Sequence, residues 1–367
     1  MRISQIAYTG FGGLGSVIFS LITADHGCKN NWSIGFIGDQ ELYDEYASLC
    51  NHLQVPYAAF QSKPGKPYRA WIALARWLDY INPEVVICHT INSILACRWY
   101  AWRNRSRLIA VEHTPNQVKT RRERAASFVS MLVADRVVVL TDDYREELRK
   151  AHGLLYNETK VRVIPNGVDT QLFRPVAKLL QTERRVIRLG MAARFSFSKR
   201  QDLLVEVMGE LANLRPNLSF EIWFAGDGEE LQRVQAVARC SPVATRIHFC
   251  GLLSEPRVAE WLKGLDIYVH ATDGETLSTS LLQAMSTGLP IVASDIPGVA
   301  NLLGANSEFG LCSANEALTF AHTILNVIDS VDLSADLGYR ARAQILANYS
   351  RQVMLQRYLD VIAECLR

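Results

Sequence analysis

Two successive series of short apolar runs constrain the fold of this chain more than any other feature of its sequence. In each series, runs rich in Ile, Val and aromatic residues alternate with longer segments of helical periodicity, and most runs are apolar on both faces. Strands buried on both faces are typical of parallel sheets covered by helices on both sides. The sequence therefore predicts an α/β fold with two doubly wound sheets.

The break between the two series predicts the domain organisation. A run at 161–164 leads into a turn at 165–169 and a polar stretch to residue 185 with little periodicity. We therefore predict an N-terminal domain over 1–168, a linker over 169–185, a C-terminal domain over 186–345 and a C-terminal helix over 346–367 that packs back on the N-terminal domain. The predicted strands lie near 3–8, 33–37, 84–88, 108–111, 136–140, 161–164, 186–193, 220–225, 246–250, 266–270 and 290–294, and the last helix presents Leu355, Leu359, Ile362 and Leu366 on one face.

Charge and cysteine usage exclude several function classes. The 367 residues include 39 basic and 37 acidic side chains, a net charge of +2, so no global field favours nucleic-acid binding. The eight cysteines show no CxxC pair or metal-ligand spacing, which is typical of reduced thiols in a cytosolic protein. Glycines interrupt the N-terminal apolar residues before a signal-peptide core can form. We expect a cytoplasmic protein, or one peripheral on the cytoplasmic face of an inner membrane.

A glycine-rich loop follows the first predicted strand. Gly10, Gly12 and Gly15 satisfy the GxGxxG spacing of a dinucleotide site, and Asp39 ends the second predicted strand. Taken alone, the loop indicates an NAD-dependent oxidoreductase. It is equally compatible with a tight turn that binds nothing, or with a loop that admits a bulky ligand held by the other domain.

Two cations follow the first predicted strand of the second series. Arg194 ends that strand and Lys199 comes five residues later, at the edge where open α/β sheets bind ligands. An arginine fork and a lysine beside a helix start are suited to a diphosphate. The turn at Gly226 ends the next strand and permits close approach of a ribose or base.

A polar segment follows the fourth strand of the second series. Glu275 lies in the loop, Ser278 or Thr279 is placed to cap the next helix, and Gln283 lies about one turn inside it. The free amides at the helix start suit an anion, while Glu275 and Gln283 are placed to accept hydrogen bonds from hydroxyls. Sugar hydroxyls fit these acceptors.

These motifs occur in the order found in one enzyme family. Arg194 with Lys199, the Gly226 turn, the spacing from Glu275 to Gln283, and the turn at 165–169 together resemble retaining glycosyltransferases of the GT-B, family-four type (glycosyl transferases group 1). The resemblance implies a GT-B fold, in which two Rossmann-like domains face each other across a cleft. It also implies a nucleotide sugar donor, a glycan or lipid-linked acceptor, and no metal or other cofactor.

The resemblance assigns roles to individual residues. It implies His113, Glu275, Arg194 and Lys199 as catalytic residues, with the two cations on the donor diphosphate and His113 and Glu275 beside the donor sugar. His89, at another strand end, is a weaker candidate. The implied donor-binding residues are Gly12, Gly13, Arg194, Lys199, Gly226, Glu275, Thr276, Leu277, Ser278, Thr279 and Gln283.

Two departures from the family pattern affect the expected donor. Gln283 stands where the family has a second glutamate that contacts ribose, and Gln lacks its charge. The family's EGFG stretch reads Glu275-Thr276-Leu277-Ser278 here, so side chains narrow the expected sugar pocket. We expect transfer from a UDP-sugar in bacterial surface polysaccharide synthesis (lipopolysaccharide or capsule). An oxidoreductase and a catalytically silent nucleotide-sugar binding module are the alternatives.

Two basic clusters in the first half bear on the acceptor. One, at 98–107, interleaves arginines with Trp99, Tyr100 and Trp102, and the other, at 119–124, begins with Lys119. Aromatic residues among arginines suit the interface of an anionic membrane. The alternative for either cluster is a solvated helix face whose tryptophans are buried.

Overall fold

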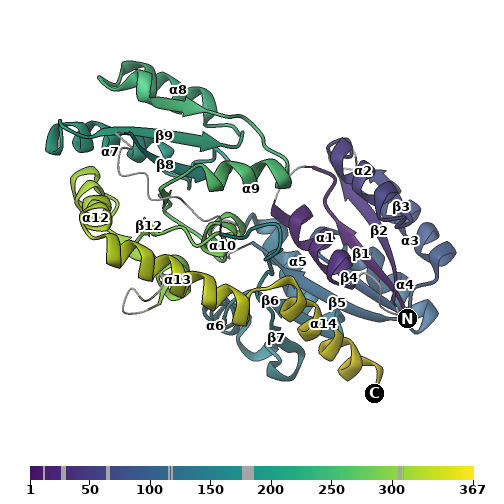
Figure 1. Ribbon diagram of the computed structural model, residues 1–367. Helices are drawn as coiled ribbons and strands as arrows, with labels where there is room; N and C mark the ends of the chain where they lie inside the picture. The colour runs from purple at the N-terminus through teal and green to yellow at the C-terminus, as the bar shows by residue number, and fades with distance from the viewer. Residues whose placement is uncertain are drawn as a thin grey trace. The chain divides into compact units, whose positions relative to one another are not determined.

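The computed structural model describes residues 1–10, 13–25, 30–62, 67–114, 116, 119–175, 186–304, 308 and 310–367. The chain divides into two compact units (Figure 1). Unit 1 comprises Met1–Gly167 together with Arg351–Arg367, and unit 2 comprises Val168–Ser350. Each unit contains one parallel sheet with alternating helices, which confirms the predicted α/β fold.

The sheet of unit 1 has seven parallel strands in the order β3-β2-β1-β4-β5-β6-β7. The central strands are completely buried on both faces, as their continuous apolar runs predict. The sequence analysis missed β3, a partly exposed edge strand. The strands are β1 (Arg2–Ala7), β2 (Asn31–Gly38), β3 (Tyr57–Gln61), β4 (Val85–Cys88), β5 (Arg107–Glu112), β6 (Arg136–Val139) and β7 (Val161–Val163).

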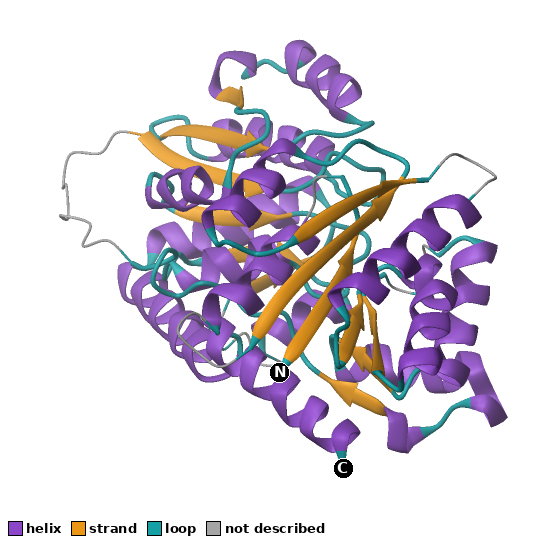
Figure 2. Cartoon of the chain, turned by 90° about the vertical axis from the view of Figure 1, so that its right-hand side faces the viewer, coloured by secondary structure: helices purple, strands orange, loops and turns teal. Residues whose placement is uncertain are grey.

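Helices cover both faces of this sheet (Figure 2), because separate apolar clusters lie on its two sides. The last helix packs against α1 on one side, with Tyr358 and Ile362 in the shared cluster. Leu366, expected on the buried face, is instead 48% exposed. The helices are α1 (Gly13–Ala24), α2 (Asp44–His52), α3 (Tyr68–Ile81), α4 (Ile94–Asn104), α5 (Arg121–Val133), α6 (Asp142–His152) and α14 (Arg351–Leu366), with 3-10 turns η1 (Ile91–Ser93), η2 (Gly153–Leu155) and η3 (Glu158–Lys160).

Unit 2 has six parallel strands in the order β10-β9-β8-β11-β12-β13. The short strand β13 was not predicted. The strands are β8 (Val186–Ala192), β9 (Ser219–Ala225), β10 (Ile247–Phe249), β11 (Ile267–His270), β12 (Ile291–Ser294) and β13 (Leu311–Ser313), and the helices are α7 (Gln201–Leu214), α8 (Leu231–Cys240), α9 (Glu255–Lys263), α10 (Thr279–Ser286), α11 (Pro297–Leu303), α12 (Ala317–Asp329) and α13 (Val331–Asn348), with a 3-10 turn η4 (Ala244–Arg246).

Both sheets reverse their strand order once. The reversal lies between the neighbouring strands β1 and β4 in unit 1, and between β8 and β11 in unit 2. Open α/β sheets bind ligands outside the carboxyl ends of the strands at such a reversal. The fold therefore singles out one edge of each sheet, and the candidate residues follow the strands that end there.

Candidate functional site

The strongest candidate site in unit 2 lies where β8 and β11 end. Lys199 follows β8, His270 ends β11, and Thr272 pairs with Lys199 through an isolated antiparallel bridge. This bridge joins the loop after β8 to the loop after β11. The topology thus brings together residues that are more than 70 positions apart in the sequence.

An ion pair forms the centre of this cluster. Lys199 Nζ donates to Glu275 Oε2, and the two side chains are only 14% and 17% exposed. His270 Nε2 lies 3.6 Å from the same Oε2, and the Thr276 amide donates to Glu275 Oε1 at 3.2 Å. Each carboxylate oxygen has a second lone pair. Glu275 can therefore accept a further hydrogen bond from a ligand hydroxyl.

The environment keeps Glu275 ionised. Burial raises the pKa of Glu275, but Lys199 and the His270 ring outweigh burial and lower that pKa to about 2. Burial lowers the pKa of His270, so its ring is neutral near pH 7. The cluster therefore pairs one fixed negative charge with the positive charge of Lys199.

The loops after β8 and β9 lie against each other. A Cβ on Gly226 would lie 2.1 Å from the Ala193 carbonyl oxygen, and Gly226 has a φ of 135°, where glycine alone is unstrained. The Phe195 amide donates to the Asp227 carbonyl at 2.9 Å. The glycine thus fixes the loop that leads to Lys199.

Helix α10 provides the remaining polar groups of unit 2. Ser278 is its N-cap and accepts from the Leu281 amide at 3.4 Å, as one of the two predicted caps. Thr279 is the first helical residue, while Leu277 and Gln283 are largely buried. Thr276 Oγ1 is buried without a hydrogen-bond partner in the described ranges. The segment therefore places hydroxyl and amide groups directly after Glu275.

In unit 1, the glycine loop follows β1 at the strand reversal. Gly12 lies outside the described residues, and Gly13 begins α1. A Cβ on Gly15 would lie 2.1 Å from the Tyr46 hydroxyl oxygen, so Gly15 packs against protein. Asp39 accepts from the Tyr8 hydroxyl at 2.6 Å. Packing within unit 1 accounts for Gly15 and Asp39 without a dinucleotide.

The two histidine candidates of unit 1 contact each other. His89 and His113 follow β4 and β5, and His89 Nδ1 lies 3.0 Å from His113 Nε2. Burial lowers the pKa of His113 to about 4, and burial with the neighbouring His113 lowers the pKa of His89 well below its ordinary value. Both rings are neutral near pH 7.

Two family profiles match the two halves of the chain. The profile described as Glycosyltransferase Family 4 matches residues 34–172, and the one described as Glycosyl transferases group 1 matches residues 186–330. The second match contains the Lys199–Glu275 cluster. The chain belongs to the family-four, group 1 glycosyltransferases.

Curated relatives of this glycosyltransferase family are distant and partly longer. One chain of phosphatidylinositol N-acetylglucosaminyltransferase from Arabidopsis thaliana is 29% identical over 174 residues, 47% of this chain and 38% of the relative. Lipopolysaccharide core biosynthesis glycosyltransferase LpsE of Rhizobium meliloti is 24% identical over 56% of this chain and 58% of the relative. The matched stretch thus spans about 38–58% of these relatives.

Solved structures of similar fold match nearly the whole chain. Anabaena Alr3699/HepE in complex with UDP and glucose gives a TM-score of 0.83 at 17% identity, over 99% of both chains. TarM of S. aureus, in a complex that includes UDP, gives a TM-score of 0.80 at 14% identity, over 98% of this chain and 99% of the other. These likenesses agree with the expected GT-B class of fold.

One contact of this glycosyltransferase was missed by the sequence analysis. Gly298, the second residue of α11, lies so close to the Glu275 loop that a Cβ would lie 2.1 Å from the Glu275 carbonyl oxygen. The available signal was the dipeptide Pro297-Gly298, directly after a strand that ends at the same edge.

The basic cluster at 119–124 was partly misinterpreted. Lys119 is completely buried and donates to Glu112 at 2.6 Å and to the Tyr144 hydroxyl at 2.6 Å. A buried, paired ammonium cannot contact a membrane surface. Lys119 instead holds the end of β5, directly before His113.

Arg194 differs from Lys199 in its surroundings. Its side chain is 73% exposed and contacts Glu229 at 3.2 Å. Because an exposed pair of this kind contributes little to folding, we expect Arg194→Ala to change the free energy of unfolding by less than about 0.5 kcal/mol. If Arg194 binds the donor, the same variant weakens nucleotide-sugar binding by about tenfold, as measured by calorimetry. Unchanged affinity would remove Arg194 from the donor site.

The described residues offer neither a metal cluster nor a membrane span. No group of three or more His, Cys, Asp or Glu side chains in those ranges is arranged to hold a metal ion. None of the helices there is both long and apolar enough to cross a membrane.

Proposed function

We propose that this chain transfers a sugar from a nucleoside diphosphate sugar, with UDP-sugars favoured, to a glycan or lipid-linked acceptor. The observation that carries the proposal is the Lys199–Glu275 pair at the strand reversal of unit 2, within the segment that matches the family profile. Neither a simple dinucleotide site nor a solvated surface loop requires this buried pair.

The proposed roles follow from charge and position. Lys199 and Arg194 take the donor diphosphate, because a leaving diphosphate gains negative charge that a preorganised cation stabilises. Glu275 accepts a hydroxyl of the donor sugar, and Thr276, Leu277, Ser278, Thr279 and Gln283 continue the donor pocket. Gly12, Gly13 and Gly226 allow close approach, and His113 contacts the sugar.

We further propose that transfer retains the anomeric configuration and needs no metal. The single buried carboxylate of the cluster, already held by Lys199, is suited to binding rather than to nucleophilic attack. Solved structures of HepE, which share this fold, hold UDP or UDP-glucose, which supports a UDP-sugar donor. LpsE supports a place in bacterial surface polysaccharide synthesis.

A binding and turnover assay tests this proposal. Thermal unfolding is measured with UDP-, GDP- and ADP-sugars and with NAD, because a ligand at about 100 times its Kd adds about 2.7 kcal/mol of stability. We expect stabilisation by a UDP-sugar, and release of UDP when the acceptor or water is available. Stabilisation by NAD alone would overturn the proposal, and binding without any transfer or hydrolysis would favour a silent binding module.

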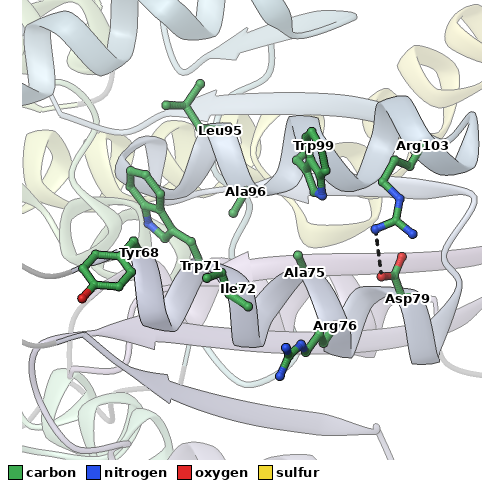
Figure 3. Close-up of a pocket in the computed structure, with 10 residues that line it drawn as sticks. All are labelled: Tyr68, Trp71, Ile72, Ala75, Arg76, Asp79, Leu95, Ala96, Trp99 and Arg103. Carbon is green, nitrogen blue, oxygen red and sulfur yellow. Dashed lines mark ion pairs between the residues drawn. The ribbon is translucent and has the colours of Figure 1, made fainter.

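The surface formed by α3 and α4 supports a membrane-linked acceptor. Figure 3 shows the pocket of about 370 Å³ between these helices, with Tyr68, Trp71 and Trp99 among its lining residues. Trp99 and Trp102 are 55% and 66% exposed, so the expectation that the tryptophans of this cluster are buried is wrong. The two helices contain four arginines and one aspartate. We propose that this surface contacts an anionic membrane on its cytoplasmic face.

A vesicle assay checks the membrane proposal. The double substitution of Trp99 and Trp102 by alanine is expected to reduce sedimentation with anionic vesicles by about tenfold, because two exposed aromatic side chains leave the interface. Binding of the unaltered protein should weaken as salt increases. Tyr339→Ala, which removes a similarly exposed aromatic ring of unit 2, is the control. Salt-independent sedimentation, or none, would contradict the proposal.

A further inference from the structure

A chain of hydrogen bonds connects α1 to His113 inside unit 1. Gln5 Nε2 donates to the Ile18 carbonyl at 3.2 Å, and Gln5 Oε1 lies 3.0 Å from His89 Nε2. His89 Nδ1 in turn lies 3.0 Å from His113 Nε2. Gln5 and His89 are both buried. A buried polar chain of this kind fixes where each proton lies, because no water competes for its groups.

The chemistry of the groups sets the direction of the chain. The Ile18 carbonyl can only accept, so Gln5 turns its NH₂ group to it and its Oε1 to His89. Reversing the Gln5 amide would place two carbonyl oxygens in contact. Because Gln5 Oε1 can only accept, the proton of neutral His89 lies on Nε2, which leaves a lone pair on its Nδ1.

His113 is the last member of the chain. Since His89 Nδ1 accepts, His113 Nε2 carries the proton and donates. The two ring planes differ by 26°, so the donor lies near the plane of the His89 ring, where the lone pair is. Burial keeps both rings neutral near pH 7 by lowering their pKa values. The second nitrogen of His113, Nδ1, is therefore a bare acceptor.

We propose that Gln5 and His89 are positioning residues, which hold His113 in the Nε2–H tautomer so that Nδ1 accepts a hydrogen bond from a ligand hydroxyl. The identity of the ligand as a sugar rests on the proposed function, whereas the tautomer does not. Within the described part of the chain, no residue bonds to His113 Nδ1. A hydroxyl or amide N–H fits this nitrogen, and a carboxylate or phosphate oxygen is repelled. His113 thus selects a hydroxyl and takes no part in holding the diphosphate.

Nitrogen NMR of the full chain tests the tautomer directly. In protein labelled with ¹⁵N-histidine, His113 and His89 should both show the chemical shifts of the Nε2–H tautomer at pH 7, assigned by loss of signal in His113→Ala and His89→Ala. An Nδ1–H tautomer at His113, or a charged ring at this pH, would overturn the proposal. This measurement needs neither substrate nor a folded variant of Gln5.

A pair of variants on β1 tests the positioning role. Gln5→Leu removes the acceptor of His89 and should give His113 a mixture of tautomers. Ser4→Ala, which removes a buried hydroxyl that lies 2.6 Å from that of Ser33, should leave the spectrum unchanged. Gln5→Leu should also lower kcat/KM for transfer about fivefold, and Ser4→Ala less than about twofold. An unaltered His113 spectrum in Gln5→Leu would contradict the role of Gln5.

The two proposals fail in distinguishable ways. If the chain transfers no sugar but His113 shows the Nε2–H tautomer, the proposed function fails and the hydrogen-bond chain stands. If transfer is observed and His113 shows the Nδ1–H tautomer, the hydrogen-bond chain fails alone. If Nδ1 selects a hydroxyl, a UDP-hexose should also bind more tightly than the corresponding UDP-uronic acid in the unaltered protein but not in His113→Ala, and equal preference in both would overturn the selection.

Discussion

Lys199→Ala is expected to lower kcat/KM for sugar transfer about a hundredfold. Among the described residues, Lys199 is the one Lys or Arg whose side chain pairs with Glu275, and both side chains are largely buried. Its removal takes a positive charge from the proposed diphosphate site and leaves Glu275 without this partner. Loss of one charge-assisted contact of about 2 to 3 kcal/mol accounts for a decrease of this size. Steady-state kinetics with the preferred UDP-sugar measures it.

The same variant has a characteristic pH dependence of stability. The folded-state pKa of Glu275, about 2, lies below its ordinary value of 4.5, so the ion pair stabilises the fold above pH 4.5 and loses this effect as pH falls toward 2. The difference in unfolding free energy between wild type and Lys199→Ala should therefore be about 2 to 3 kcal/mol at pH 7. It should shrink below pH 4.5.

Lys263→Ala is the matched control for Lys199→Ala. Lys263 pairs with Glu260 on α9, and Glu260 is 74% exposed. Removal of this surface pair should change stability by less than about 0.5 kcal/mol and leave kinetics unaltered. Equal effects of both variants would show that Lys199 has no special role, and Lys199→Arg should restore part of the activity because it keeps the charge.

Gly298→Ala is expected to destabilise unit 2 by about 2 to 3 kcal/mol and to lower kcat/KM at least about tenfold. The new Cβ would lie 2.1 Å from the Glu275 carbonyl oxygen and 3.3 Å from that of Thr276. Both obstacles are backbone atoms, so no side chain can rotate away. The loop must move, and Glu275 moves with it relative to Lys199. Chemical denaturation and steady-state kinetics measure the two effects.

Gly209→Ala controls for the general effect of adding a methyl group. Gly209 lies inside α7, and a Cβ there meets nothing within 4 Å. Alanine is the better helix former, so this variant should raise stability by about 0.5 to 1 kcal/mol without changing activity. A Gly298→Ala protein with wild-type stability and kinetics would exclude a tight contact between α11 and the Glu275 loop.

The fold was predictable where burial is strongest. Strands such as β4 and β6 are apolar along most of their length, because helices cover both of their faces, and the pattern identifies them directly. The sheet edges were harder, since β3 is only half-buried and β13 has three residues. Edge strands have one neighbour and need fewer apolar residues, so their pattern is weak.

The candidate site was predictable only in part. Strand ends placed Arg194, Lys199 and Glu275 at one edge of a sheet, but the pairing of Lys199 with Glu275 depends on loop conformations that no local pattern encodes. Lys119 shows the same limit, because its charged sequence neighbours indicate a surface and the folded sheet provides Glu112 as its partner. Contacts between distant residues decide what each charge does.

The division of unit 1 into two chain segments bears on its biosynthesis. The strands of its sheet are translated first, but α14, which fills one side of the same core, is translated last, after the whole of unit 2. Met354, Tyr358 and Ile362 are therefore missing from the nascent core while the ribosome makes residues 168–350. Unit 2 is continuous in sequence and can finish folding before unit 1. The segment translated first is thus the last to reach its native packing, and a chaperone that shields α1 in the interval would meet its need.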